Sequence, residues 1–180
     1  MLWPTGRALS MESMQCADGY TMRLATAADA ASFRALMEVV DLGTWDDETL
    51  ARTINALLPS GWRVIVHTAS GDLVATGMAH YRPLQEIYPN GYEVGWIAAH
   101  PDHSGHRLGR TIVAATTSRL MELGAECIYL QTDDFRLPAI RTYLDVGFVP
   151  HLWAPGMADR WRQVCKQIGW PYTPSAWPPS

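Results

Sequence analysis

The sequence predicts an α/β protein built on a central mixed sheet of six to seven strands flanked by helices. Short β-branched or alternating runs recur along the chain, and helical stretches with one apolar stripe separate several of them. Three of these runs follow one another with only loops between them, which is the pattern of an antiparallel meander. The third run is followed by a helix and then by a nearly all-apolar strand, which is the pattern of a parallel βαβ unit.

The N-terminal third predicts a leader, a strand and two helices. Residues 1–18 mix proline, glycine and small polar residues without a period, so we expect a flexible leader there. The alternating run over residues 20–25 predicts a short strand. A first helix follows from the helical spacing of Phe33, Leu36, Met37 and Val40. A second helix is expected from a stripe made of Leu50, Ile54, Leu57 and Leu58, with Pro59 beyond its end.

The middle of the chain predicts the meander. Residues 62–68 and 73–80 are β-branched runs separated by Ala-Ser-Gly-Asp, which has the composition of a hairpin turn. A loop rich in proline and polar residues covers residues 81–90. The third strand is expected over residues 92–99.

A glycine-containing turn connects this third strand to a helix. Gly105 and Gly109 can take positive φ without steric cost, and a helix that begins near Arg107 leaves its first backbone N–H groups unpaired. The positive end of the helix dipole lies behind those groups, and Arg110 adds a formal charge. The turn therefore has the properties of a phosphate-binding cradle, although an ordinary strand-to-helix connection remains the alternative for the turn taken alone.

The last third predicts one more βα pair and a C-terminal helix. Residues 127–131 form the apolar strand that completes the βαβ unit, and residues 138–146 predict a helix closed by Gly147. A last strand is expected over residues 148–153. Within residues 156–180 a helix is expected from a stripe made of Met157, Trp161, Val164, Cys165 and Ile168. We expect this helix and the Pro/Trp-rich tail behind it to pack on the domain or on a partner subunit, which would make the protein a homodimer.

Composition limits the class of protein. A chain of 180 residues that is 48% hydrophobic suits one well-buried domain. No apolar run is long enough for a membrane span or a secretion signal, so we expect a cytoplasmic protein. A net charge of -4 without a dense Lys/Arg cluster argues against nucleic acid as a partner. The three cysteines, Cys16, Cys127 and Cys165, lack metal-ligand spacing, so we expect free thiols and no metal site.

Three pieces of sequence stand in a characteristic order: GYEVGWIAAHP, then HSGHRLGR, then CIYLQ followed by LPAIRTYLDVGF. Together they resemble the GNAT superfamily of acyl-CoA-dependent N-acyltransferases. The resemblance covers roughly residues 20–153, within a domain that we place at 19–155, and it is most specific over residues 93–148.

The phosphate-binding turn departs from the pattern of that superfamily at two positions. The usual pattern is Gln or Arg, two residues, Gly, one residue, and Gly or Ala. Ser104 stands here in place of Gln or Arg, and Arg107 in place of the first Gly. The later helix usually carries Asn near the position of Pro138, whereas Ala139 and Tyr143 keep the expected spacing.

The resemblance implies a sheet that splays between its fourth and fifth strands and holds acetyl-CoA in the gap. The pantetheine arm would pair like an extra strand with the backbone of Ile97, Ala98 and Ala99. The resemblance places the pyrophosphate on the turn, on Ser104, Gly105, His106, Arg107, Leu108, Gly109 and Arg110. It implies an N-acetyltransferase that moves the acetyl group directly to a primary amine of a small molecule or peptide.

Two residues are the candidate catalytic groups. Glu93 lies in an otherwise apolar strand, where desolvation makes a carboxylate hold a proton more readily, as a general base must. A carboxylate on a wet strand face is the alternative. Tyr143 matches the position of the superfamily's usual acid beside the thiolate, although an amphipathic core aromatic would follow the same pattern. His80 is a reserve base.

Two rival functions remain open at the level of sequence. One is a GNAT-like domain that binds acyl-CoA as a sensor or assembly module without turnover, which the altered turn would favour. A P-loop nucleotide enzyme is the other, and the turn lacks the Gly-Lys-Ser/Thr that grips phosphate and magnesium.

Overall fold

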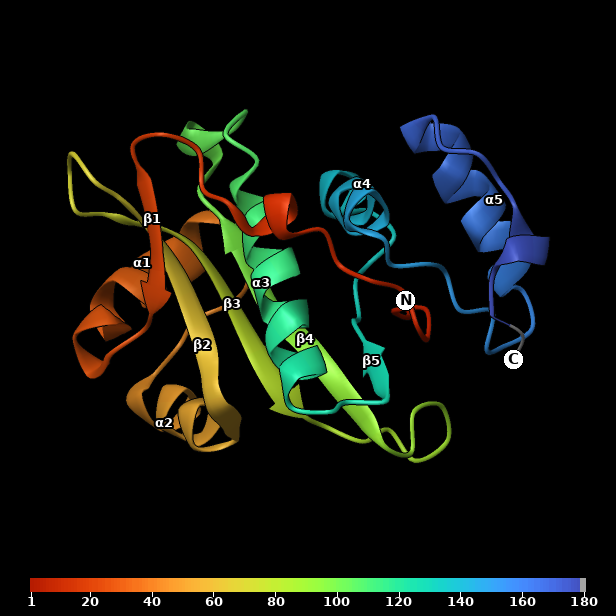
Figure 1. Cartoon of the computed structure of the whole chain (residues 1–180), viewed down its shortest axis with the longest axis horizontal. Coiled ribbons are helices and arrows are strands. Elements are labelled where there is room, and N and C mark those ends of the chain that lie inside the picture. The colour runs from red at the N-terminus through yellow and green to blue at the C-terminus, as the bar shows by residue number, and fades with distance from the viewer. Residues whose placement is uncertain (179–180) are drawn as a thin grey trace.

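The computed structural model describes residues 1–178 and contains one five-stranded mixed sheet (Figure 1). Its strands follow sequence order: β1 Tyr20–Leu24, β2 Leu57–His67, β3 Leu73–Tyr81, β4 Gly91–Ala99 and β5 Cys127–Tyr129. The first three pairings are antiparallel and β4 pairs with β5 in parallel, as the meander and the βαβ unit predict.

The prediction of six to seven strands is wrong. Among residues 1–178 the sheet has five, and residues 148–153, which were expected to form a last strand, make only a single antiparallel bridge between Val149 and Leu2. Leu2 also bridges Tyr129, so the N-terminal segment lies where a sixth strand would pair with β5. Pro150 has no N–H to continue a ladder beyond Val149.

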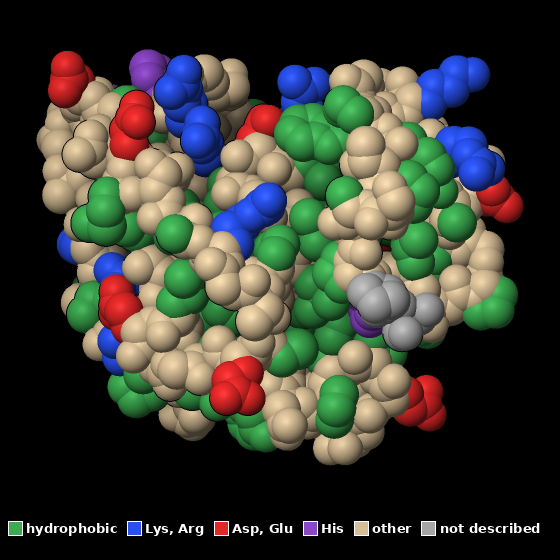
Figure 2. Space-filling view, turned by 45° about the vertical axis from the view of Figure 1, so that its right-hand side comes forward, with side chains coloured by type: hydrophobic (Ala, Val, Ile, Leu, Met, Phe, Trp, Pro, Cys, Tyr) green, Lys and Arg blue, Asp and Glu red, His purple; other side chains and the backbone are tan. Residues whose placement is uncertain are grey.

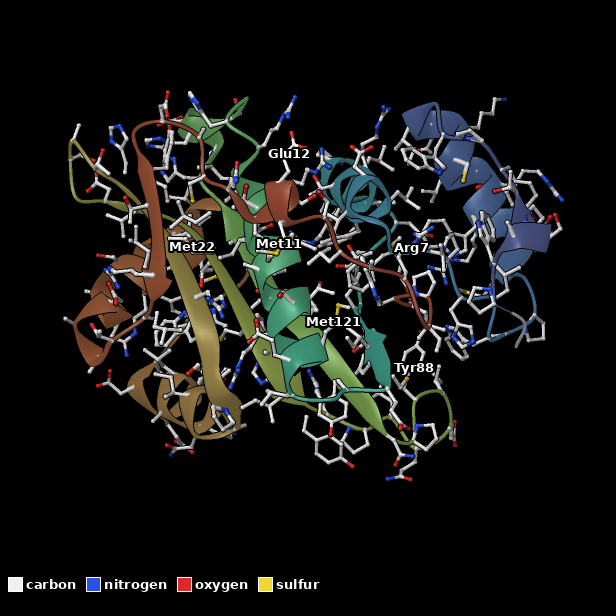
Figure 3. All side chains as sticks on the ribbon, viewed as in Figure 1. Arg7, Met11, Glu12, Met22, Tyr88 and Met121 are labelled. Carbon is white, nitrogen blue, oxygen red and sulfur yellow. The ribbon has the colours of Figure 1, made fainter. Side chains whose placement is uncertain are left out.

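The N-terminal segment packs on the domain, which differs from the flexible leader expected over residues 1–18. Met1 and Trp3 are buried, and the Trp3 amide donates to the Ile128 carbonyl at 2.9 Å. Farther along, Thr111 Oγ1 donates to the Gln15 carbonyl at 3.3 Å. Figure 3 labels Met11 and Glu12 where this segment passes in front of α3. Apolar residues near the start of the chain thus extend the core at the open edge of β5.

Helices cover both faces of the sheet. α1 (Ala30–Val39) packs Phe33 and Met37 on one face, and α2 (Asp47–Asn55) lies beside it. On the other face, α3 (Leu108–Glu122) buries Leu108 and Ile112 against β2 and β3. α4 (Leu137–Val146) packs beside α3, so the sheet forms the middle layer of three (Figure 1).

The second helix is shorter than the sequence predicts. α2 ends at Asn55, and Leu57 already pairs with His80 as the first residue of β2. The apolar pair at 57–58 therefore belongs to a strand that carries an irregularity before Trp62. A short apolar run fits either periodicity, and its pairing with β3 decides the outcome.

The C-terminal helix α5 (Met157–Ile168) packs on the domain itself. Its stripe buries Trp161, Val164 and Cys165 in the same cluster as Leu144 of α4. Arg141 donates to the Ile168 carbonyl at 2.9 Å. The final two residues of the Pro/Trp-rich tail, 179 and 180, lie outside the described residues. Within residues 1–178, no helix combines the length and the apolar character needed to cross a membrane.

Candidate functional site

The site lies where β4 loses its neighbour. β5 pairs with β4 only at residues 91–93, whereas β3 stays paired with β4 as far as Ala99 (Figure 1). Beyond Glu93 the other edge of β4 has no strand partner within residues 1–178. Free backbone groups at such an edge can pair with an extended ligand.

A β-bulge reshapes β4 along this open stretch. Ala98 lies opposite Thr76 but Gly95 lies opposite Met78, so β4 carries one extra residue there. Trp96 takes up the distortion with φ of 50°, and its ring packs edge-on against Trp45 with centroids 4.5 Å apart. A non-glycine residue in this region is strained and is often found at binding sites.

A pocket of about 200 Å³ fills the splay, and both candidate catalytic residues line it together with Ile97. Glu93 contributes from β4 and Tyr143 from α4, and the segment between β5 and α4 closes the pocket with Asp133 and Arg136. The structure therefore brings Glu93 and Tyr143, 50 positions apart in sequence, to one small cavity.

Glu93 is not on a wet strand face, because only 6% of the residue is exposed. Its Oε2 accepts a hydrogen bond from Arg82 Nη1 at 3.1 Å. A Cβ atom at Gly95 would lie 3.6 Å from Glu93 Oε2 and 3.4 Å from His80 Cδ2. Because glycine occupies this position, the space over both side chains stays open to a ligand atom.

His80 lies opposite Glu93 in the pairing of β3 with β4. It is buried, and its Nε2 has no hydrogen-bond partner among the described residues. Burial, followed by the charge of Arg82, lowers the pKa of His80 to about 4. The imidazole is therefore neutral near pH 7 and offers an unshared electron pair beside Glu93.

Tyr143 faces the pocket from α4, one helical turn after Ala139, which also lines it. Burial raises the pKa of Tyr143 to about 12, so the hydroxyl keeps its proton near neutral pH. Such a group can donate a hydrogen bond or a proton to a developing anion. The three cysteines are free, and burial raises the pKa of each thiol. No activated thiolate nucleophile is present in the described part of the chain.

The predicted cradle forms at the start of α3. Gly105 has φ of +85° and Arg107 has φ of +57°, and α3 begins at Leu108. Thr111 is the first residue whose amide donates to a helical carbonyl, that of Arg107, so the preceding amides of the first turn are available to an anion. Arg107 thus keeps the left-handed conformation that glycine favours, at the cost of some strain.

A cavity of about 620 Å³ opens in front of the cradle, between α3 and α4. Of the residues expected to bind the cosubstrate, it is lined by Ala99, Ser104, Gly105, Arg107, Leu108, Gly109 and Arg110. His106 instead lines an adjacent cavity against residues 12–17, and the side chain of Ala98 is buried in the cluster on the α1 side of the sheet. In Figure 2, Lys and Arg side chains and a histidine gather along the upper edge, the edge at which the turn before α3 lies in Figure 1.

The cradle and the pocket with the candidate catalytic residues follow one another along β4. Ile97 lines the pocket and Ala99 lines the cradle cavity, and two residues on a strand span about 7 Å on the same face. α4 borders both, through Tyr143 at the pocket and Thr142 at the cradle. Within residues 1–178, no group of three or more His, Cys, Asp or Glu side chains is arranged to hold a metal ion.

Comparison with known proteins decides the family. The model of the acetyltransferase (GNAT) family matches residues 30–148. The chain belongs to the GNAT acetyltransferase family. No curated protein sequence matches it.

Solved GNAT acetyltransferases share its fold at low sequence identity. Ribosomal-protein-S18-alanine N-acetyltransferase from Escherichia coli is 17% identical with a TM-score of 0.59, covering 73% of this chain and 79% of its own. Ard1 from Thermoplasma volcanium is also 17% identical with a TM-score of 0.60, covering 74% and 84%. A putative GNAT acetyltransferase from Novosphingobium aromaticivorans is 22% identical with a TM-score of 0.55, covering 74% and 52%.

Sequence reasoning missed three contributors to the pocket of this GNAT acetyltransferase. Arg82 pairs with Glu93, and Arg136 and Asp133 close the pocket from the segment before α4. Each stands in a connection whose letters show no period. Arg82 lies two positions after His80 in the sequence. This closeness to a candidate base was the one sequence signal that could have identified Arg82.

Proposed function

We propose that this protein transfers the acetyl group of acetyl-CoA directly to a primary amine. The observation that carries the proposal is the open edge of β4, which leads from the cradle to the pocket that holds Glu93 and Tyr143. Family membership supports acyl transfer, and the features of the site described below support acetyl-CoA as the donor and a primary amine as the acceptor.

The cradle fits the pyrophosphate of acetyl-CoA. Unpaired amides at the start of α3 would donate to its oxygens, and Arg107 and Arg110 would add positive charge. The backbone of Ile97, Ala98 and Ala99 lies on the strand edge that would hold the pantetheine arm. The thioester that CoA supplies would then reach the pocket at the bulge near Trp96.

The residues of the pocket account for both proton transfers. The amine nitrogen forms a bond to the thioester carbonyl carbon as the C–S bond breaks, so one proton leaves the nitrogen and the sulfur leaves as a thiolate. Glu93 accepts the proton from nitrogen, and Tyr143 donates one to sulfur. His80 is the reserve base, because it is neutral and its Nε2 has no hydrogen-bond partner among residues 1–178. Direct transfer fits the absence of an activated cysteine among the described residues.

Release of free thiol from acetyl-CoA in the presence of an amine panel tests this proposal. Glu93→Gln should lower kcat/KM about a hundredfold, because the amide keeps the shape but cannot take the proton. Glu122→Gln is the matched control, since Glu122 also pairs with an arginine, Arg119 at 3.0 Å, but lies at the far end of α3. Unchanged rates in Glu93→Gln on a verified acceptor would reject the role of Glu93.

Tyr143→Phe separates turnover from binding. Removal of one hydroxyl should slow kcat while acetyl-CoA affinity measured by calorimetry stays near normal. A protein that binds acetyl-CoA tightly but releases no thiol with any amine would instead be the acyl-CoA sensor that the altered cradle sequence favours.

A further inference from the structure

The pocket contains four charged side chains, and they form two pairs of opposite sign. Arg82 contacts Glu93 at 3.1 Å, and Arg136 Nε contacts Asp133 at 3.4 Å. No carboxylate among the residues that line the pocket therefore lacks a guanidinium partner. A polycationic acceptor such as a polyamine gains little from a site whose negative charge is already neutralised.

The two arginines differ in how many N–H donors remain free for a ligand. Arg136 also donates from Nη2 to the Asp41 carbonyl at 3.0 Å, and its side chain is only 26% exposed, so it ties the segment before α4 to the loop after α1. Among the described residues, the Arg82 side chain makes one hydrogen bond, to Glu93, and 58% of it is exposed. A guanidinium has five N–H donors, so Arg82 keeps donors for a ligand.

We propose that Arg82 binds a carboxylate of the acceptor, and that the acceptor is an α-amino acid or a similar small molecule with its carboxylate next to its amine. This inference rests on the proposed acetyl transfer at the same site. An ammonium group that approaches Glu93 also approaches the like charge of Arg82, which costs energy for a simple amine. A carboxylate on the adjacent carbon reverses that cost.

The geometry of the pair suits such a molecule. Glu93 and Arg82 present opposite charges in direct contact, and an α-amino acid presents its amine and carboxylate one carbon apart. The acceptor amine can therefore lie on Glu93 while its carboxylate lies on Arg82. The pocket volume of about 200 Å³ suits a compact acceptor, and Leu42 and Trp96 supply an apolar wall for its side chain.

Matched pairs of acceptors test this inference: methionine with methioninamide, phenylalanine with phenylalaninamide, and spermidine as a polycation. The carboxamide has the less basic amine, because it lacks the nearby negative charge that stabilises the ammonium form. Intrinsic reactivity thus favours the amide, and a preference for the acid must come from the protein. We expect kcat/KM to favour the amino acid over its amide at least tenfold, about the effect of one charge-assisted hydrogen bond.

Arg82→Gln should remove this preference selectively. Loss of the contact with Glu93 affects both substrates alike, so the ratio of kcat/KM for the amino acid to kcat/KM for its amide should fall at least tenfold, through the KM of the amino acid. Arg162→Gln is the matched control, because Arg162 has a similar exposure of 61% and also pairs with an acid, Asp159, but lies on α5. A purely structural role of Arg82 would lower both activities together.

The outcomes separate this inference from the proposed function. Thiol release with amides or spermidine as good as with amino acids would overturn the inference and leave acetyl transfer intact. No thiol release with any amine would reject the proposed function and the inference with it. If Arg82→Gln does not fold, the comparison of acid and amide in the unmodified protein still decides between these results.

Discussion

The cradle and the pocket with the candidate catalytic residues lie side by side along β4 but are built in opposite ways. The cradle is made of consecutive residues, and its properties come from backbone amides and from the positive φ of Gly105 and Arg107. The pocket collects Glu93 from β4 and Tyr143 from α4, His80 lies beside it opposite Glu93 on β3, and all three residues are buried. Burial lowers the pKa of His80 and raises that of Tyr143, whereas the anion binding proposed for the cradle depends on the conformation of its main chain.

The largest expected effect comes from His80 and concerns stability in acid. Its pKa is about 4 in the folded protein, because of burial, and about 6.5 in an unfolded chain. The unfolded state therefore binds more protons between these values, and the free energy of unfolding should fall as pH decreases from 6.5 to 4. The loss should approach roughly 3 kcal/mol at the lower limit.

Denaturant unfolding at several pH values measures this loss. His80→Gln should reduce the slope between pH 6.5 and 4, to which the buried Met1 ammonium also contributes because burial lowers its pKa to about 5. Both proteins should lose stability further below pH 4. The Arg23 guanidinium lowers the pKa of Asp29 to about 2, so that carboxylate loses its stabilising contribution only in the more acidic window. An unchanged slope in His80→Gln would contradict the burial of a neutral imidazole beside the pocket.

The same contrast explains how much of the site the sequence could predict. The turn around Gly105 and the start of α3 are contiguous, so local rules for glycine and helix ends located them. Arg82 acquires its importance only through its contact with Glu93, across the turn from β3 to β4, and no periodicity reports such a contact. Periodicity also placed Leu57 in a helix, because the pairing with His80 that makes it a strand residue is likewise non-local.

The edge of the sheet beside β5 also depends on contacts between distant segments that the sequence pattern does not report. The run at 148–153 has strand composition, but Leu2 already bridges both Tyr129 and Val149. Segments separated by most of the chain compete for that edge, and composition alone does not reveal which one pairs. Apolar character at Met1 and Trp3 was the available signal that the N-terminal segment packs into the core.

A second prediction tests the cradle through its main chain. Gly105→Val places a β-branched residue at φ of +85°, so the turn should change conformation and acetyl-CoA affinity should fall more than tenfold. Gly124→Val is the matched control: Gly124 has φ of +76°, equally open surroundings, and a position at the other end of α3, about 20 Å away.

Both substitutions introduce similar strain and should lower the melting temperature to a similar degree. Calorimetry with acetyl-CoA, done well below both melting temperatures, should show weak binding only for Gly105→Val. Equal affinities in the two variants would mean that the conformation of the turn does not determine phosphate binding.

The smallest expected effect concerns His103, a histidine beside the cradle as His80 is a histidine beside the pocket. His103 lines the cradle cavity, and its Nδ1 lies 2.9 Å from the Tyr20 hydroxyl. Desolvation, followed by the charges of His67 and His100, lowers the pKa of His103, so the ring is neutral at pH 7. The charge of Asp102 raises the pKa of His103, and the charge of His106 lowers it.

Protonation of His103 adds a positive charge beside the proposed phosphate site. CoA affinity should therefore rise as pH decreases below 6.5. The rise should be about two- to fivefold, because His103 is partly exposed and solvent screens its charge. Dephospho-CoA is the suitable probe, because it lacks the monoester phosphate whose own pKa of about 6 would obscure the effect. His103→Gln should reduce the pH dependence. If CoA affinity in the unmodified protein does not depend on pH, the cradle binds phosphate through its main chain and arginines alone. The cradle would then differ from the pocket in having no titrating histidine that affects its function.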